Sequence, residues 1–266
     1  MKSLQLSNLS LGYIDNEGTG PSILLVHGNS SSKETFKKQL ANKSYRIVAI
    51  DLPGHGDSEK YEDASSYNIP GYAAIVAEAA KALGMEDAVI VGWSLGGHVV
   101  LEAVEQLPKA KGFVIYGTPP LAFPPAMEEG FLPHPAMAVG FAAELTDEQI
   151  AAYADAFFSE GIKAPADPFL SDIRRTDGNT RAGLAASIVP DGYTDEIKIV
   201  ENLTTPLAIL HGVNEQLVNI EYLKSLKIPS LWKSSVQIID NAGHATHWEN
   251  SEQFNNVLFS FVDAVN

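Results

Sequence analysis

The stretch Gly92-Trp93-Ser94-Leu95-Gly96 decides the fold, because it has the spacing G-x-S-x-G. It follows the apolar run Ala88–Val91 and precedes a stretch of helical character, as expected of a sharp turn between a strand and a helix. Glycines on both sides of a serine relieve crowding at such a turn, and the hydroxyl is pushed out where a substrate can reach it. The spacing also arises by chance in apolar, Gly-rich chains, so the surrounding sequence has to supply the strand and the helix. Ser94 is therefore the first residue that we expect to do chemistry.

Short apolar segments rich in Ile, Val and Leu recur along the chain and alternate with helical patterns. They are typical of strands buried on both faces of a mostly parallel sheet flanked by helices, which is the α/β class. The predicted strands are Ile23–Val26, Arg46–Ile50, Ala88–Val91, Gly112–Tyr116, Leu207–Leu210 and Ser235–Ile239, after a weaker antiparallel beginning at Leu4–Leu6 and Tyr13–Ile14. The predicted helices are Thr35–Leu40, Tyr72–Leu83, Leu95–Leu107, Ile220–Leu226 and Ser251–Ala264.

The composition predicts one soluble, enzyme-sized unit, because 266 residues with 45% hydrophobic content can bury a large core. A formal net charge of −15 argues against nucleic acid as a partner, since binding phosphates needs clustered Lys and Arg. The absence of Cys excludes disulfides, thiolate metal sites and a cysteine nucleophile. No apolar run is long enough to span a bilayer, and Met1–Ser10 lacks a signal-peptide pattern. We therefore expect a cytoplasmic protein that has no membrane partner.

The segment 119–200 breaks the alternation of strands and helices, because it is rich in Pro, Ala and aromatic residues. Helices are predicted within it at Asp147–Phe158 and Arg181–Ile188. Ligands of open α/β sheets bind at the carboxyl ends of the strands, so we interpret this segment as a cap inserted into a core of residues 1–118 and 201–266. Eight large cap residues either line the pocket beneath it or only pack the cap onto the core: Phe123, Met127, Phe131, Met137, Phe141, Tyr153, Phe157 and Phe158.

Two further residues are candidates to activate the serine. A serine hydroxyl is a poor nucleophile at neutral pH, so Ser94 needs a base that takes its proton and a carboxylate that orients the base. Glu215 is the only carboxylate in the loop after the predicted strand Leu207–Leu210, and His244 follows the last predicted strand. A loop glutamate is most often only solvated, but these positions place an acid and a base at the carboxyl end of the sheet. We predict Glu215 as the acid and His244 as the base.

The chain has 7 histidines, so the choice of base rests on position. His247 lies close to His244 in the chain, but it has no preceding glycine and lies nearer the terminal helix. His98 lies one helical turn after Ser94, and we expect it to pack beside the elbow. No further His or Cys lies near the pair His244 and His247 to complete a metal site, so we predict neither a metal nor a cofactor.

Two backbone amides are candidates to bind the negative charge that develops on a substrate oxygen. Leu95 begins the helix after the elbow, and the N-terminal end of a helix favours negative charge. Asn29 lies in the loop after the first predicted parallel strand, where the second amide donor of such an oxyanion hole is expected. The side chain of Asn29 is also a candidate to bind a substrate carbonyl.

Four motifs together resemble the α/β-hydrolase superfamily across nearly the whole chain. They are the loop His27-Gly28, the turn Asp51–Ser58, the elbow Gly92–Gly97 and the terminal Ala242–His244. The chain order of serine, acid and histidine is also that of α/β-hydrolases. A serine at the elbow disfavours epoxide hydrolases and haloalkane dehalogenases, which have Asp there. Leu95 departs from the Ser-Met-Gly pattern common in cofactor-free haloperoxidases and carbon–carbon bond hydrolases.

A narrower set of matches resembles the metal-independent N-acyl-homoserine lactonases of this superfamily. The matching stretches are Gly92–His98, Asn214–Asn219, Ala242–His244 with His247–Glu249, and in the cap Asp167–Phe169 with Arg175–Gly178. This resemblance implies that the acid of the triad is Glu rather than the commoner Asp, which fits Glu215. It further implies that Asn29 and a cap tyrosine, best matched by Tyr153, contact the substrate.

The resemblance implies a serine hydrolase that opens the lactone ring of N-acyl-homoserine lactones through an acyl-enzyme, an activity that quenches quorum sensing. A carboxylesterase of small linear esters is the alternative, because the same triad opens both kinds of ester. A hydrolase-fold receptor that captures a small ligand is an alternative from a different class. The expected partner is thus a small ester or lactone, and the sequence leaves acyl-chain length and oligomeric state open.

Overall fold

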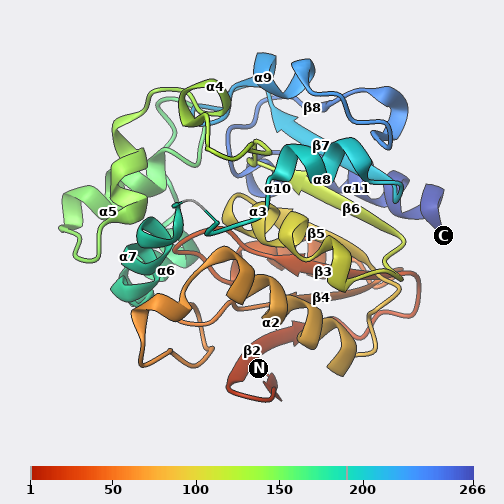
Figure 1. The fold of residues 1–266 in the computed structure, drawn as a ribbon, viewed down its shortest axis with the longest axis horizontal. Coiled ribbons are helices and arrows are strands. Elements are labelled where there is room, and N and C mark those ends of the chain that lie inside the picture. Colours follow the sequence, from red (N-terminus) through yellow and green to blue (C-terminus); the bar gives the residue numbers. More distant parts are fainter. Residues whose placement is uncertain (1, 190) are drawn as a thin grey trace.

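The computed structural model describes residues 2–189 and 191–266, which form one eight-stranded sheet with helices on both faces (Figure 1). The strand order is β1-β2-β4-β3-β5-β6-β7-β8. The strands are β1 (Lys2–Gln5), β2 (Ser10–Asp15), β3 (Ser22–Val26), β4 (Arg46–Ile50), β5 (Val89–Trp93), β6 (Gly112–Tyr116), β7 (Leu207–Gly212) and β8 (Gln237–Ile239). The predicted α/β class is confirmed.

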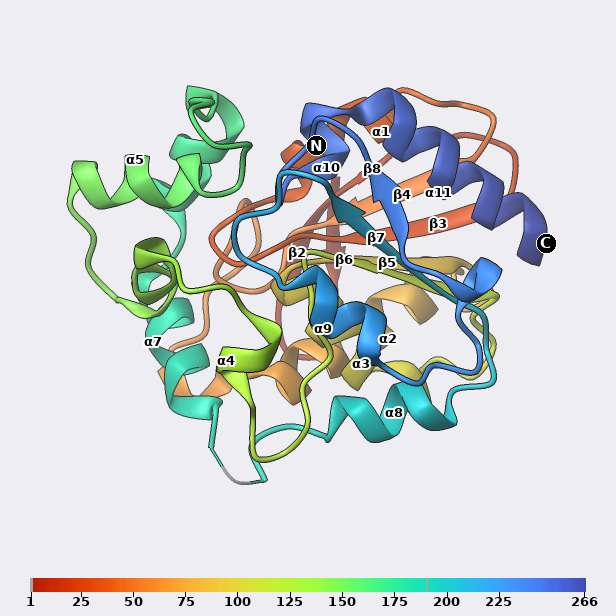
Figure 2. The ribbon, with the colours of Figure 1, turned by 90° about the horizontal axis from the view of Figure 1, so that it is seen from above.

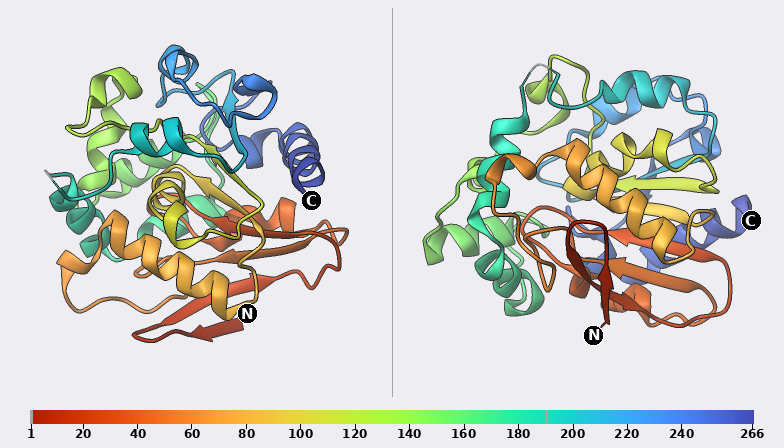
Figure 3. Two further views of the ribbon diagram at one scale, coloured as in Figure 1. Left: turned by 45° about the vertical axis from the view of Figure 1, so that its right-hand side comes forward. Right: turned by 60° about the horizontal axis from the view of Figure 1, so that its bottom comes forward.

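The sheet is antiparallel at its N-terminal edge and parallel elsewhere. β1 pairs with β2, and β2 with β4, in antiparallel fashion, whereas every pairing from β4 to β8 is parallel. Figure 3 shows the N-terminal hairpin in dark red at this edge. The parallel strands all end on the same side, so the loops that follow them meet at one edge of the sheet.

β2, next to the edge strand β1, and the edge strand β8 are among the strands that differ in length from the prediction. β2 is longer than Tyr13–Ile14, because Ser10 pairs with Gln5 of β1 and the far end pairs with β4. β8 is shorter than predicted and begins at Gln237 instead of Ser235, because its pairing with β7 begins there. Pairing partners therefore set these strand ends.

Two groups of helices cover the two faces of the sheet, as Figure 2 shows. One face carries α2 (Ile69–Ala82), α3 (Leu95–Glu102), α8 (Glu196–Asn202) and α9 (Ile220–Ser225), and the other carries α1 (Lys37–Leu40), α10 (Thr246–Glu249) and α11 (Ser251–Val265). The short turns of this core are η1 (Lys33–Phe36), η2 (Ala64–Ser66), η3 (Val104–Gln106) and η6 (Trp232–Ser234). Successive strand residues point to opposite faces, so Ile90 packs in the cluster of α3 and Val91 in that of α11. None of the helices within the described ranges is long and apolar enough to cross a membrane.

Two helices of the core, α2 and α3, differ from the prediction by three residues or more at one end. The helix predicted over Leu95–Leu107 ends at Glu102, and the chain continues as the tighter turn η3. α2 begins at Ile69 rather than Tyr72, because the side chain of Asn68 accepts a hydrogen bond from the Gly71 amide at 2.7 Å. This cap extends the helix by satisfying one of its free N–H groups.

The segment predicted as a cap contains short helices and lies over the carboxyl ends of the parallel strands, on the left in Figure 1. Its elements are α4 (Met127–Gly130), η4 (Pro135–Phe141), α5 (Asp147–Asp155), η5 (Ala166–Leu170), α6 (Ser171–Arg175) and α7 (Gly178–Ser187). α5 begins with a capping box between Thr146 and Gln149 and ends before the predicted Phe158. α8 starts inside the segment and crosses the boundary that we propose at residue 200.

Buried polar contacts attach the cap to the core. Asp172 of α6 accepts a hydrogen bond from the Ser32 hydroxyl at 2.6 Å and pairs with Arg175 at 2.7 Å. Arg181 of α7 donates to the Ser30 hydroxyl at 3.1 Å. These contacts fix the cap above the loop that follows β3, and they define where the pocket between cap and core lies.

Candidate active site

Ser94 lies between β5 and α3, at the apex of a strand–turn–helix. Its backbone has φ 54° and ψ −120°, a conformation that residues other than glycine rarely adopt. The amide of Ser94 donates to the Tyr116 carbonyl at 2.9 Å, which holds the turn against β6. A Cβ on Gly92 would lie 2.2 Å from the Gly96 carbonyl oxygen, and one on Gly96 would lie 2.3 Å from that of Val26. The two flanking glycines are thus required by close packing of the elbow.

His244 and Glu215 lie side by side in the loops after β8 and β7. His244 Nδ1 lies 2.9 Å from Glu215 Oε2, and each side chain is only 2% exposed. Glu215 also accepts a hydrogen bond from the Leu217 amide at 2.8 Å. Burial raises the pKa of Glu215, but the His244 charge and hydrogen bond, with the Leu217 amide, together lower it below its ordinary value. Glu215 is therefore an ionised acceptor that orients the imidazole.

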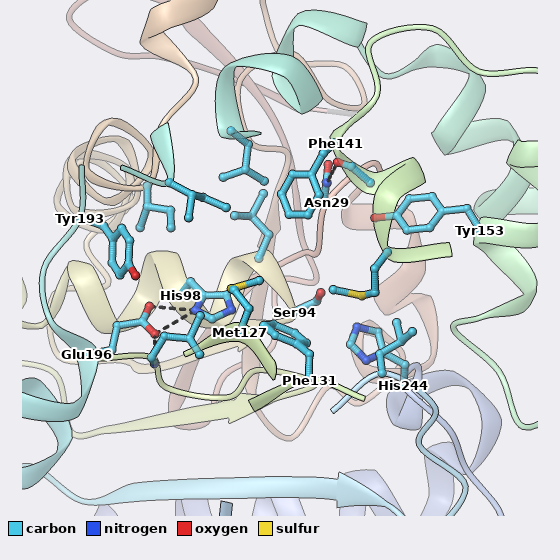
Figure 4. Close-up of a pocket in the computed structure, with 18 of the residues that line it drawn as sticks. Asn29, Ser94, His98, Met127, Phe131, Phe141, Tyr153, Tyr193, Glu196 and His244 are labelled. Atoms are coloured by element: carbon cyan, nitrogen blue, oxygen red, sulfur yellow. Dashed lines mark hydrogen bonds and ion pairs between the residues drawn. The ribbon is translucent and has the colours of Figure 1, made fainter. Parts of the chain in front are cut away.

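The other ring nitrogen of His244, Nε2, has no hydrogen-bond partner within the described residues. His244 and Ser94 line the same pocket, and Figure 4 shows both among the residues around it. A Cβ on Gly117 would lie 2.7 Å from the ring carbon Cε1, and the ring of Phe157 stacks on His244 with centroids 5.7 Å apart. The imidazole is thus clamped with one nitrogen free toward the pocket.

His247, the rival candidate for the base, lies fully buried in the core instead. Its ring packs against Trp93, Phe36 and Tyr116, with centroids 4.7, 5.2 and 5.4 Å away. Neither ring nitrogen has a hydrogen-bond partner among the described residues. Burial lowers its pKa well below the ordinary histidine value, so the ring stays neutral and serves packing.

Asn29 and Leu95 lie where the sequence analysis expects the two amide donors. Asn29 is in the loop after β3, and this loop passes close to the elbow, since a Cβ on Gly28 would lie 3.1 Å from that of Ser94. Leu95 is the first residue of α3. The Asn29 side chain donates to the Gly140 carbonyl of the cap at 2.6 Å, so it joins the cap to this loop.

The cap closes the pocket over Ser94 with apolar side chains. Six of the eight candidate cap residues line it, namely Met127, Phe131, Met137, Phe141, Tyr153 and Phe157. The other two pack elsewhere, Phe158 against Phe169 and Phe123 against Tyr193. Tyr153 is 7% exposed, and a Cβ on Gly140 would lie 2.8 Å from its hydroxyl. The Tyr153 hydroxyl therefore lies beside the Asn29 loop.

The arrangement suits nucleophilic acyl transfer. A neutral imidazole beside a serine can take its proton, and an ionised carboxylate stabilises the imidazolium that forms. An amide at the start of a helix can stabilise an oxyanion. Across residues 2–189 and 191–266, the structure shows no group of three or more His, Asp or Glu arranged to hold a metal ion.

A family model described as alpha/beta hydrolase fold matches residues 21–251 of this chain. The chain belongs to this α/β-hydrolase family. Over 267 residues it is 28% identical to a pimeloyl-(acyl-carrier protein) methyl ester esterase of Xanthomonas campestris pv. campestris, covering 95% of this chain and 99% of that protein. It is 27% identical over 263 residues to a non-heme chloroperoxidase of Burkholderia pyrrocinia, covering 91% of each.

A solved structure of the N-acyl homoserine lactonase AidH, a mutant in complex with N-hexanoyl homoserine lactone, resembles this α/β-hydrolase with a TM-score of 0.93. The two chains are 33% identical, and the match covers 98% of this chain and 96% of that one. The resemblance to the N-acyl-homoserine lactonases is confirmed. Together with the esterase, this neighbour identifies the chain as a hydrolase of the family.

The sequence analysis missed a second histidine–carboxylate pair in this α/β-hydrolase pocket. We expected His98 only to pack beside the elbow, but its Nδ1 lies 2.8 Å from Glu196 Oε1 and 3.0 Å from Oε2. Glu196 is the first residue of α8, almost a hundred positions away, and it is 1% exposed. No local pattern in the sequence signals this contact, because it depends on where α8 packs against α3.

Proposed function

We propose that this α/β-hydrolase opens the lactone ring of N-acyl-homoserine lactones without a metal and thereby quenches quorum sensing. The observation that carries the proposal is the Glu215-bound His244 lining one pocket with Ser94, beneath an apolar cap. The similarity to AidH, whose solved complex holds N-hexanoyl homoserine lactone, favours this substrate class. The apolar cap residues that line the pocket give the acyl chain a binding site.

In the proposed reaction, the Ser94 hydroxyl oxygen attacks the lactone carbonyl while His244 Nε2 takes its proton. The amides of Leu95 and Asn29 stabilise the oxyanion that forms. The ring carbon–oxygen bond then breaks, and the proton passes from His244 to the departing oxygen. Water, deprotonated by the same nitrogen, hydrolyses the acyl-enzyme. The product is N-acyl-homoserine, which carries a new carboxylate.

Asn29 and Tyr153 have positioning roles in this proposal. Asn29 joins the cap to the loop next to Ser94, and the Tyr153 hydroxyl lies beside the same contact. Both groups are polar in a pocket whose walls are otherwise mostly apolar. A lactone that enters this pocket meets them at the end where its ring and amide oxygens need hydrogen bonds.

A carboxylesterase that acts on small linear esters is the second candidate. The similarity to the pimeloyl-(acyl-carrier protein) methyl ester esterase favours it. The proposed chemistry does not separate the two, because attack on a linear ester differs only in the leaving group.

Turnover of a substrate panel tests the proposal. N-acyl-homoserine lactones and p-nitrophenyl esters are incubated with the protein and with Ser94→Ala, and products are identified by mass spectrometry. We expect the lactone mass plus one water, and mild acid should close this product back to the lactone. Free fatty acid with homoserine lactone would identify an amidase instead. Fast hydrolysis of the linear esters without any lactone turnover would leave the esterase.

A further inference from the structure

The pair His98 and Glu196 lies on the wall of the proposed acyl pocket, away from His244 (Figure 4). Nδ1 of His98 faces the Glu196 carboxylate, and Nε2 lies on the opposite edge of the ring, toward the pocket. The His98 side chain is 13% exposed, whereas that of Glu196 is 1% exposed. Among the described residues the His98 side chain bonds only through Nδ1, and the ring lines the pocket, so Nε2 is a polar atom that a ligand can reach.

The hydrogen bonds around Glu196 decide which nitrogen of His98 carries the proton. Glu196 Oε2 accepts from the Leu121 amide at 2.8 Å, and both carboxylate oxygens face His98 Nδ1. An ionised carboxylate only accepts hydrogen bonds, so Nδ1 is the donor. In the neutral ring, Nε2 then carries a lone pair and acts as an acceptor.

The surroundings of Nε2 are mostly apolar. Met127, Phe131 and Leu121 line this part of the pocket, and the ring of Phe131 lies 6.5 Å from that of His98. The nearby Tyr193 hydroxyl donates to the Ala122 carbonyl at 3.3 Å. A polar atom that a bound ligand covers without pairing penalises a purely apolar ligand, and it favours a ligand that supplies a hydrogen-bond donor.

We propose that His98 Nε2 forms a subsite that accepts a hydrogen bond from a hydroxyl group on the acyl chain of the substrate. The subsite rests on the proposed function, because it assigns the acyl chain of the substrate to this side of the pocket. Glu196 holds the tautomer that makes Nε2 an acceptor. A carbonyl at the same place has no hydrogen to offer, and an unsubstituted chain leaves Nε2 unpaired.

Three substrates of one chain length test the subsite: an N-acyl-homoserine lactone that is unsubstituted, one with a 3-hydroxyl and one with a 3-oxo group. We expect kcat/KM to be about tenfold higher for the hydroxyl substrate than for the other two, the value of one hydrogen bond. His98→Phe should remove this preference, so that the three substrates are hydrolysed with similar kcat/KM. Phe131→Leu changes the same wall without touching a polar atom, and it should keep the preference.

Glu196→Gln provides a gain of activity that a folding defect does not produce. The Gln oxygen can accept from the Leu121 amide while its NH₂ group donates to His98 Nδ1. Nε2 then carries the proton and donates, so hydrolysis of the 3-oxo substrate should rise toward that of the hydroxyl substrate. No change in the 3-oxo preference would overturn the tautomer assignment.

The methyl esters of the same three acids are measured in parallel. If the lactones are not hydrolysed but the methyl esters are, the proposed function fails while the subsite can still be read from the esters. A hydroxyl preference that survives in His98→Phe would overturn the subsite. The subsite would also be wrong if His98→Phe lowered kcat/KM for all three substrates by the same factor, because the hydroxyl preference would then be unchanged.

Discussion

His244 with Glu215 and His98 with Glu196 place two histidine–carboxylate pairs around one pocket, with nearly equal bond lengths. Nδ1 lies 2.9 Å from Glu215 Oε2 and 2.8 Å from Glu196 Oε1, and both carboxylates are almost fully buried. The rings differ in their surroundings. His244 is clamped between Gly117 and Phe157, whereas His98 stands more open to the pocket. A carboxylate thus orients a histidine, but the group that faces Nε2 decides what the histidine does.

Ser94→Ala tests the first half of this comparison and should have the largest effect. Removing the hydroxyl should lower kcat/KM by roughly 10⁴-fold or more, because nucleophile, base and acid act as one unit. It should also abolish labelling by a fluorophosphonate probe. His98→Phe is the control and should stay labelled. Labelling at another serine, with activity intact, would refute the assignment of Ser94.

Glu215→Gln and Glu196→Gln compare the two pairs directly. In Glu215→Gln the new NH₂ group faces His244 Nδ1 and favours the tautomer whose Nε2 is already protonated, so it cannot accept the serine proton. We expect kcat on an unsubstituted substrate to fall about 10²- to 10⁴-fold. Glu196→Gln should change the same rate less than about threefold. Equal losses in the two variants would mean that the pairs do not have separate roles.

The two pairs were not equally predictable from the sequence. Glu215 and His244 each lie directly after a predicted strand, and parallel strands bring the loops at their carboxyl ends together. Glu196 begins a helix that the sequence analysis did not expect, and its contact with His98 depends on the packing of α8 on α3. Local hydrophobic patterns indicate where strands lie, whereas contacts between helices depend on the whole fold.

The cap shows the same limit on prediction. The sequence placed apolar residues over the pocket, but it did not separate Met127 and Phe131, which line it, from Phe123 and Phe158, which pack elsewhere. All four side chains are apolar and lie in similar stretches of sequence, so only the path of the short cap helices distinguishes them. A pocket wall is therefore harder to predict than the elbow beneath it.

Asp172 extends the comparison to a buried carboxylate that pairs with arginine. Burial raises its pKa to about 6, although the Ser32 hydrogen bond and Arg175 lower it. The folded state therefore binds this proton more tightly than the unfolded chain, whose ordinary value is 3.8. The stability that Asp172 contributes should fall as pH rises from about 4 to about 6 and stay constant above that. The pKa of Glu215 is lowered in the folded state, so the stability that Glu215 contributes should instead fall as pH falls.

Urea unfolding of the protein and of Asp172→Asn between pH 4 and 8 measures this effect. The free energy of unfolding of the protein, minus that of the variant, should decrease by up to about 3 kcal/mol across the lower half of this range. Most other titrating groups are shared by both proteins and cancel in the difference. A difference that is constant or rises with pH would show that Asp172 is ionised throughout.

Tyr153→Phe should lower activity less than Ser94→Ala or Glu215→Gln does, and it tests how the reacting end of the pocket differs from the acyl end. The substitution removes one hydroxyl beside the Asn29 loop and keeps the ring, which packs against Phe157 with centroids 4.8 Å apart. If the hydroxyl contacts the lactone or its amide, kcat/KM should fall about tenfold, by the same factor for every chain length, since one hydrogen bond is lost.

His98→Phe should instead change the ranking of substituted chains and leave the unsubstituted series nearly intact. The measurement is kcat/KM for unsubstituted lactones of increasing chain length with both variants. A loss in Tyr153→Phe that is confined to long chains would place its hydroxyl at the acyl end, beside the subsite of His98. The proposed assignment of Tyr153 to the reacting end and His98 to the acyl end would then be wrong.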